Sequence, residues 1–172
     1  MPKQRTDDLI AIGQAMAKMR LIIGRRYIGR VALRELDGAF DLGHLDVLGV
    51  VKRRGRNQEV TIGLIADDIR IDHSRASRIV AELVRLGVVR REASQEDARR
   101  TIVALTESGR ELMAQVDDTK HEVLDKTLED WPAEDIATFA RLYDRFTLKM
   151  EQQANDFDAE CASARPDQKV SR

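Results

Sequence analysis

Two serines and two arginines lie close together in a segment with helical periodicity. Apolar residues recur at helical spacing from Ala76 to Leu86, which predicts a short amphipathic helix over about 72–86. With that stripe turned to the core, the opposite side presents Ser74, Arg75, Ser77 and Arg78 in the first two turns. Arginine can donate two hydrogen bonds to a guanine edge, and serine can bond to several bases or to phosphate. An ordinary solvated helix face is the alternative, and the helix alone does not decide between them.

A second apolar segment precedes this helix and completes a helix pair. Its apolar residues also recur at helical spacing, from Ile62 to Ile69. Asp72 occupies the position expected of an N-cap, since its carboxylate can accept from amides of the following turn. Gly87 follows the last apolar position, as a residue that ends a helix often does. The segment therefore predicts a helix-turn-helix.

A basic hairpin is predicted directly after the helix pair. Residues 88–92 and 101–105 favour strands, and the polar run 93–100 between them predicts a long exposed tip. An arginine held out on such a tip, as Arg99 and Arg100 would be, suits a narrow minor groove. Asp97 can pair with an arginine of the tip and orient it. The alternative is a solvated turn, because surface ion pairs contribute little.

Together these residues resemble the MarR family of bacterial winged helix-turn-helix transcriptional regulators. The resemblance rests on the recognition helix 74–80, on Asp97-x-Arg99, and on Leu105-Thr106-Glu107-Ser108-Gly109. Arg70 departs from the family pattern, because a glycine is common there. The resemblance implies a homodimer that binds a pseudo-palindromic operator in double-stranded DNA. It also implies repression that a small effector relieves.

The fold class expected from this pattern is mainly α with a small β-hairpin wing (α+β). Long apolar stripes from Leu9 to Val31 and from Ile136 to Met150 need a partner to bury them. An intrachain helical bundle is the alternative. We therefore expect an N-terminal dimerisation helix (1–36), a winged helix-turn-helix DNA-binding domain (37–108), C-terminal dimerisation helices (109–155) and a disordered tail (156–172).

Charge is distributed unevenly along the chain. The chain as a whole carries 29 Lys and Arg against 30 Asp and Glu, whereas residues 52–110 carry 13 against nine. The winged segment is therefore locally basic, which favours phosphate contact there. Arg53 and Arg54 belong to a compact basic cluster that suits either a phosphate contact or a solvated loop between helices.

An effector site is expected between the dimerisation helices and the winged lobe, as the family resemblance implies. Its candidate residues are Arg20, Arg26, Tyr27 and His44. One charged donor beside apolar walls would hold a small aromatic carboxylate or phenol. For His44, a capping or structural role is the alternative.

Other classes of function find no support in the sequence. The three histidines are scattered, and neither a nucleophile elbow, a glycine-rich phosphate loop nor a metal-ligand cluster occurs. We expect no catalytic site, no metal and no cofactor. The chain has no run of 18 apolar residues, so we expect no membrane span and a cytoplasmic location. A non-specific architectural DNA-binding protein and a winged-helix protein-interaction module remain as alternatives.

Overall fold

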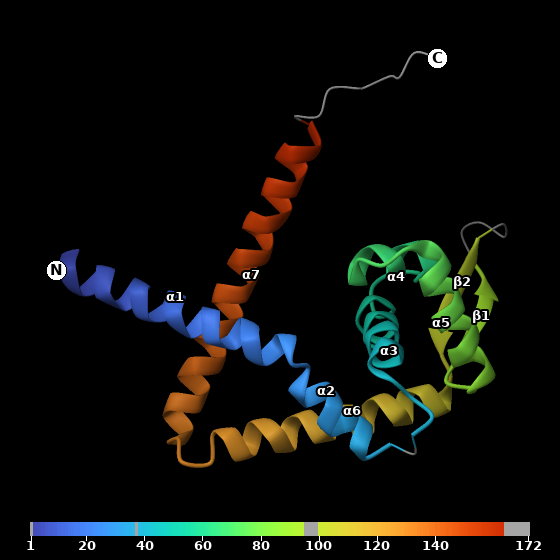
Figure 1. Ribbon diagram of the computed structural model, residues 1–172, viewed down its shortest axis with the longest axis horizontal. Helices are drawn as coiled ribbons and strands as arrows, with labels where there is room; N and C mark the ends of the chain where they lie inside the picture. Colours follow the sequence, from blue (N-terminus) through green and yellow to red (C-terminus); the bar gives the residue numbers. More distant parts are fainter. Residues whose placement is uncertain (1, 37, 95–99, 164–172) are drawn as a thin grey trace. The chain divides into compact units, whose positions relative to one another are not determined.

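The computed structural model describes residues 2–36, 38–94 and 100–163 (Figure 1). Their elements, in chain order, are α1 (Pro2–Gly24), α2 (Tyr27–Arg34), α3 (Leu42–Arg54), α4 (Ile62–Ile69), α5 (His73–Arg85), β1 (Val89–Ala93), β2 (Thr101–Leu105), α6 (Glu107–Thr127) and α7 (Ala133–Ser163). The chain divides into two compact units, Met1–Leu124 and Asp125–Arg172. The predicted fold class, mainly α with a small hairpin wing, is confirmed.

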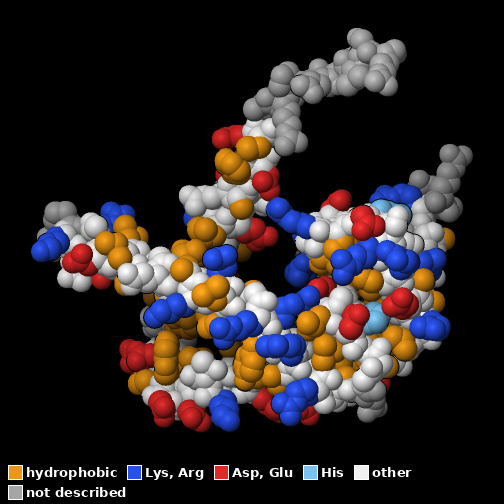
Figure 2. Space-filling model, in the orientation of Figure 1, with side chains coloured by type: hydrophobic (Ala, Val, Ile, Leu, Met, Phe, Trp, Pro, Cys, Tyr) orange, Lys and Arg blue, Asp and Glu red, His pale blue; other side chains and the backbone are white. Residues whose placement is uncertain are grey.

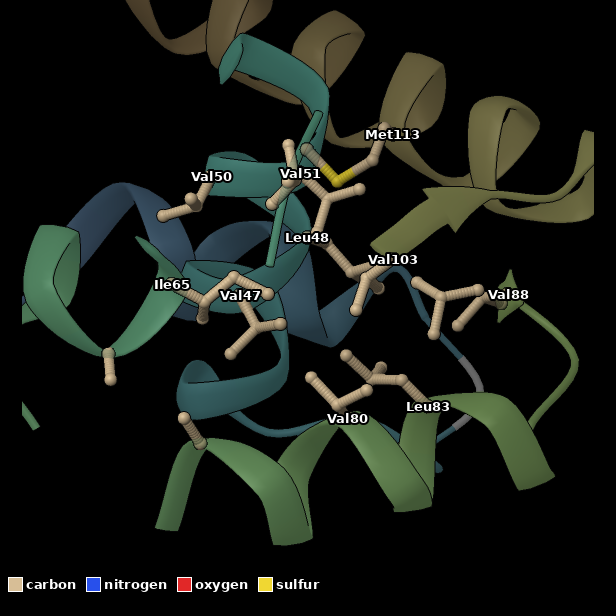
Figure 3. Close-up of a cluster of buried hydrophobic side chains, with 14 of the residues drawn as sticks. Val47, Leu48, Val50, Val51, Ile65, Val80, Leu83, Val88, Val103 and Met113 are labelled. Carbon is tan, nitrogen blue, oxygen red and sulfur yellow. The ribbon is translucent and has the colours of Figure 1, made fainter. Parts of the chain in front are cut away.

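The core of the first unit is aliphatic and surrounds α3. Val47 and Leu48 of α3 are fully buried against Ile65 of α4 and against Val80 and Leu83 of α5 (Figure 3). Each such side chain stabilises the fold by about 1.5–3 kcal/mol relative to an exposed one. The helix pair therefore has one fixed face, and its other face is left for solvent or a partner.

The predicted helix caps are confirmed. The side chain of Asp72 accepts a hydrogen bond from the backbone N–H of Arg75 at 2.8 Å, and Thr61 caps α4 in the same way. Gly87 has a φ of 74° directly after the end of α5. Arg70 ends α4 with a φ of 53°, a conformation that costs a non-glycine residue about 1–2 kcal/mol. The turn thus keeps the backbone geometry typical of a glycine although the residue is arginine.

The wing is an antiparallel pair of strands whose register runs from Val89 opposite Leu105 to Ala93 opposite Thr101. The Val103 N–H donates to the Val60 carbonyl at 2.8 Å, which ties β2 to the segment before α4. The Ser94 N–H donates to the Arg100 carbonyl at 2.9 Å, so the pairing continues toward the tip. Residues 95–99 lie outside the described part of the chain.

The base of the wing is joined closely to the first turn of α6. The Thr106 N–H donates to the Val88 carbonyl, and the Thr106 hydroxyl donates to the Gly87 carbonyl while accepting from the Gly109 N–H. A Cβ placed on Gly109 would lie 1.9 Å from the Val88 oxygen. This close approach is the physical reason for the glycine in Leu-Thr-x-x-Gly.

Two sequence-based helix bounds need correction. The segment 1–36, expected to be one helix, is interrupted after Gly24, because Arg26 adopts a left-handed conformation with a φ of 52°. Helix α7 continues to Ser163, past residue 156, where we expected the tail to begin. Residues 156–163 include two alanines and a glutamate, which favour helix, and their one large apolar side chain, Phe157, is exposed. Residues 164–172 of the predicted tail lie outside the described part of the chain.

The second unit consists of the end of α6 and all of α7. Pro132 immediately precedes α7, and Trp131 packs edge-on against Phe139, which stacks on Tyr143. Most α7 side chains are exposed. Over the described ranges, none of the helices combines the length and apolar character that crossing a bilayer would need.

We predict that Gly109→Ala destabilises the protein by at least about 2 kcal/mol, because the added methyl group overlaps the Val88 carbonyl. Gly49→Ala is the matched control, since Gly49 lies in α3 and a Cβ there meets nothing within 4 Å. That control should stabilise by about 0.5–1 kcal/mol. Urea denaturation followed by circular dichroism measures both. Equal stability of the two variants would contradict the packing argument.

Candidate nucleic-acid interface

The four predicted contact residues of the recognition helix lie where the sequence pattern placed them, in the first two turns of α5. Ser74, Arg75 and Arg78 are exposed, and Ser77 is half-buried. The opposite face of α5, formed by Ala76, Val80 and Leu83, is fully buried, so the helix cannot rotate without exposing core. Within the described part of the chain, no carboxylate pairs with the guanidinium of Arg75 or Arg78.

The wing supplies the second part of the predicted interface. Arg100 immediately precedes β2 and is exposed. Asp97 and Arg99 lie outside the described residues, so their predicted contacts stay predictions. The recognition helix and the wing are joined directly, because the Val88 N–H donates to the Leu83 carbonyl at 3.2 Å. The two parts of the interface therefore share one rigid junction.

Arg53 and Arg54 share a single carboxylate. Both guanidinium groups lie 2.6 Å from an oxygen of Asp68, and Arg54 adds a second hydrogen bond from Nε at 3.2 Å. The hydrogen bond from Arg54 lowers the pKa of Asp68 below its ordinary value of 3.8; burial opposes this shift, and Arg53 reinforces it. These pairs tie the end of α3 to α4, so both arginines have a structural role besides any contact with phosphate.

The predicted effector residues do not gather into one site. Arg20 is exposed on α1, and Tyr27 is exposed at the start of α2. Arg26 pairs with Asp46 and donates to the Leu42 carbonyl at 3.1 Å. It also lines a cavity of about 470 Å³, which we call the Arg26 cavity and whose lining includes Phe40, Ile79 and Arg75.

His44 has the capping role that the sequence left open. Asp41 and His44 form a capping box at the start of α3, in which the Asp41 N–H donates to Nδ1 at 3.0 Å and the His44 N–H donates to the Asp41 carboxylate at 2.8 Å. Because Nδ1 accepts, the neutral ring carries its hydrogen on Nε2, which lies 3.1 Å from a Glu82 oxygen. Both ring nitrogens are thus engaged, and the ring joins α3 to α5.

A larger cavity, of about 680 Å³, lies at the base of the wing. We call it the wing-base cavity. It is bounded by the end of α3, the strand β2 and the start of α6, and its cationic lining includes Arg90 and Arg110. Sequence reasoning missed it, because residues from 51 to 113 meet there only after the hairpin has folded and no local spacing marks them.

Comparison with known proteins places the winged segment in a family. The MarR family model matches residues 40–100. These residues form a MarR-family domain. No curated protein is significantly similar to the chain in sequence.

Solved structures extend the likeness over most of the chain. A MarR family protein from Bacillus stearothermophilus has a TM-score of 0.69 and 18% identity, over 82% of this chain and 96% of that one. A transcriptional regulator from Thermotoga maritima has a TM-score of 0.62 and 19% identity, over 83% and 98%. A variant of S. aureus MepR bound to an oligodeoxyribonucleotide has a TM-score of 0.55 and 17% identity, over 80% and 96%. The fold is thus that of MarR-family transcription regulators.

The ion pairs of Asp68 lead to a prediction about pH. Since its pKa is lower in the folded than in the unfolded chain, Asp68 stabilises the protein above the unfolded pKa, and this contribution disappears as the pH falls through the folded pKa. Asp68→Asn should therefore cost about 1–2 kcal/mol at neutral pH, with the difference from wild type shrinking below about pH 4. Urea unfolding at several pH values measures this.

The neighbouring Asp67→Asn is the control, because Asp67 is exposed on the same helix and has no ion pair among the described residues. It should change stability little at any pH. A loss for Asp68→Asn that stays constant down to pH 3 would show that the charge of Asp68 is not what stabilises the fold.

Proposed function

We propose that the protein is a homodimeric, sequence-specific DNA-binding transcriptional regulator that represses its target until a small effector releases it. The observation that carries the proposal is the face of α5. There Arg75 and Arg78 project without a carboxylate partner among the described residues, from a helix whose other side is packed in the core. Exposed arginines without carboxylate partners are ready to donate to guanine edges or phosphate. A structural role, as for Arg53 and Arg54, would require such partners.

The basic hairpin supports this proposal. In a winged helix the recognition helix occupies the major groove, and a hairpin arginine suits the adjacent minor groove. Arg100, with Arg99 and Asp97 of the tip, would supply that contact, and Arg53 would contribute to phosphate binding through its exposed side. The MepR variant bound to an oligodeoxyribonucleotide shows that a related fold accommodates DNA.

Exposed apolar side chains on two helices support the homodimer. On α1, Leu9, Ile12, Met16, Met19, Leu21 and Ile23 are between 41% and 64% exposed. On α7, the same is true of Phe139, Tyr143, Leu148, Met150 and Phe157. Figure 2 shows orange hydrophobic side chains along both helices. Exposed apolar side chains in this number indicate an interface on each helix. In a two-fold dimer, the second copy of the chain would cover the same side chains on both subunits. A two-fold dimer would present two recognition helices to successive major grooves, about 34 Å apart, as a pseudo-palindromic operator requires.

Release by a small aromatic or phenolic acid completes the proposal. S. aureus MepR, whose structure bound to ethidium bromide resembles this chain with a TM-score of 0.56, supports a ligand site in a protein of this fold. The residues Arg20, Arg26, Tyr27 and His44 stay a prediction for such a site. Among them, Arg26 lines a cavity.

The DNA-binding proposal predicts that Arg75→Ala and Arg78→Ala each weaken discrimination between operator and scrambled duplex by about 1–3 kcal/mol, because each removes a base contact. Fluorescence anisotropy against the DNA flanking the gene, with scrambled duplex as competitor, measures this. Arg85→Ala is the control, since Arg85 is exposed in the last turn of the same helix. Uniform weakening on every duplex would indicate an architectural protein. No binding at low salt would indicate a protein-interaction module.

The dimer proposal predicts a sedimenting species of twice the 19.5 kDa chain mass. Phe146→Glu should dissociate it, because a charge would replace an apolar side chain within the interface, whereas the adjacent exposed Arg145→Glu should leave it intact. Sedimentation velocity at several concentrations measures both. A wild-type monomer at all concentrations would contradict the proposal.

A further inference from the structure

The wing-base cavity combines apolar walls with an excess of positive charge. Val60, Ile102 and Met113 contribute to its walls, and its cationic residues are Lys52, Arg56, Arg90 and Arg110. Glu59 is the one acidic residue among the described residues that line it. Its volume of about 680 Å³ lies within the usual range for small-molecule sites.

Two of its arginines converge on a single atom. Arg90 donates from Nη1 to the Leu105 carbonyl at 2.9 Å, and Arg110 donates from Nη1 to the same oxygen at 3.1 Å. The two guanidinium groups are therefore close and repel each other. Glu92 and Glu107 offset this charge, but neither lines the cavity. Arg90 Nη2 has no acceptor among the described residues.

The other cations of the cavity differ in how far they are neutralised. Lys52 pairs with Asp117, which also accepts from Lys120 at 2.9 Å. Burial raises the pKa of Asp117, but the hydrogen bonds and charges of Lys52 and Lys120 together outweigh it, so the pKa lies below its ordinary value. Arg56 is exposed and has no ion pair within the described ranges. An anion in the cavity would therefore meet donors of Arg56 and Arg90 that have no acceptor among the described residues. Arg110 could join them by exchanging one of its present acceptors, because all three of its guanidinium nitrogens already donate to Glu107 or Leu105.

We propose that the wing-base cavity binds a small organic carboxylate with an apolar body. A carboxylate has two oxygens and can bridge two guanidinium groups, while the apolar walls hold the rest of the molecule. The single carboxylate of Glu59 in the lining disfavours a more highly charged anion. The Arg26 cavity is a poorer match, because its lining holds as many carboxylates, Asp41 and Asp46, as arginines, and Asp46 already pairs with Arg26.

A molecule bound in the wing-base cavity would lie against the end of β2, the second strand of the wing. Leu105 is the last residue of β2, and its carbonyl is the atom for which a bound carboxylate would compete. Losing those hydrogen bonds changes how the end of β2 is held against α6. The effect on DNA rests on the proposed function, because a change at the end of β2 can release an operator only if the wing binds DNA. The binding site itself does not depend on that function.

Calorimetric titration of the full chain with 2-naphthoate tests the site. We expect saturable binding of naphthoate. The neutral isostere 2-naphthamide should bind at least about tenfold more weakly. Arg90→Gln and Arg110→Gln should each weaken naphthoate binding about tenfold, because each removes a charged donor. Arg91→Gln is the matched control, since Arg91 is exposed on the same strand and does not line the cavity. It should bind normally.

A variant that fills the cavity tests the site without removing an arginine. Ala104 lines the cavity opposite Arg90, so Ala104→Phe should block binding by filling the cavity with both arginines intact. Circular dichroism melting verifies that each variant folds. Unchanged naphthoate binding in Arg90→Gln, Arg110→Gln and Ala104→Phe, or equal binding of naphthoate and naphthamide, would overturn the proposal.

The DNA arm of the experiment distinguishes the two proposals. Naphthoate should weaken operator binding by wild type but not by Arg90→Gln. If no duplex is bound at all, the proposed function fails while calorimetry still decides the site. If the Arg90 and Arg110 variants bind naphthoate normally but lose affinity for every duplex, their guanidinium groups contact phosphate and the carboxylate site is wrong.

Discussion

The close contact between α6 and the Val88 carbonyl holds the winged helix-turn-helix part of this protein together. Only a residue without a Cβ fits at Gly109, where the methyl group of alanine would lie 1.9 Å from that oxygen. Thr106 adds hydrogen bonds to Gly87, Val88 and Gly109, so the end of α5, both strands and the first turn of α6 meet within a few residues. The direction of the wing relative to the recognition helix is therefore a consequence of backbone geometry, which surface substitutions leave unchanged.

With that geometry fixed, the arginines of the winged lobe fall into two groups according to their partners. Arg53 and Arg54 are held by the mostly buried carboxylate of Asp68, which fastens α3 to α4. Arg75 and Arg78 have no such carboxylate in the described part of the chain and lie on the helix face opposite the core. Because Asp68 already engages the guanidinium groups of Arg53 and Arg54, the second group is the better placed to donate to base edges.

The features that could be predicted from the sequence are those that depend on local spacing. The apolar period of α5, the Asp72 cap and the two strand segments all come from neighbouring residues, and the structure confirms them within one residue. The break at Arg26 could not be predicted, because its left-handed conformation is supported by Leu42 and Asp46, distant in sequence. The length of α7 was underestimated, because the absence of large apolar side chains was weighed above helix propensity.

The site residues follow the same rule. The exposed position of Arg75 and Arg78 was predictable because one helix carries both, whereas the wing-base cavity draws on α3, β2 and α6 together.

The base of the wing combines a rigid contact with an exchangeable one. At Gly109, steric exclusion fixes the junction, and no ligand can substitute for it. At Leu105, four residues earlier, the junction depends on hydrogen bonds from Arg90 and Arg110 to a carbonyl oxygen, and any better acceptor can take those donors. A carboxylate is such an acceptor, because its charge strengthens each bond and relieves the repulsion between the two guanidinium groups. A bound carboxylate would therefore change how the end of β2 is held while the wing keeps its fold, and the proposed release of DNA requires this combination.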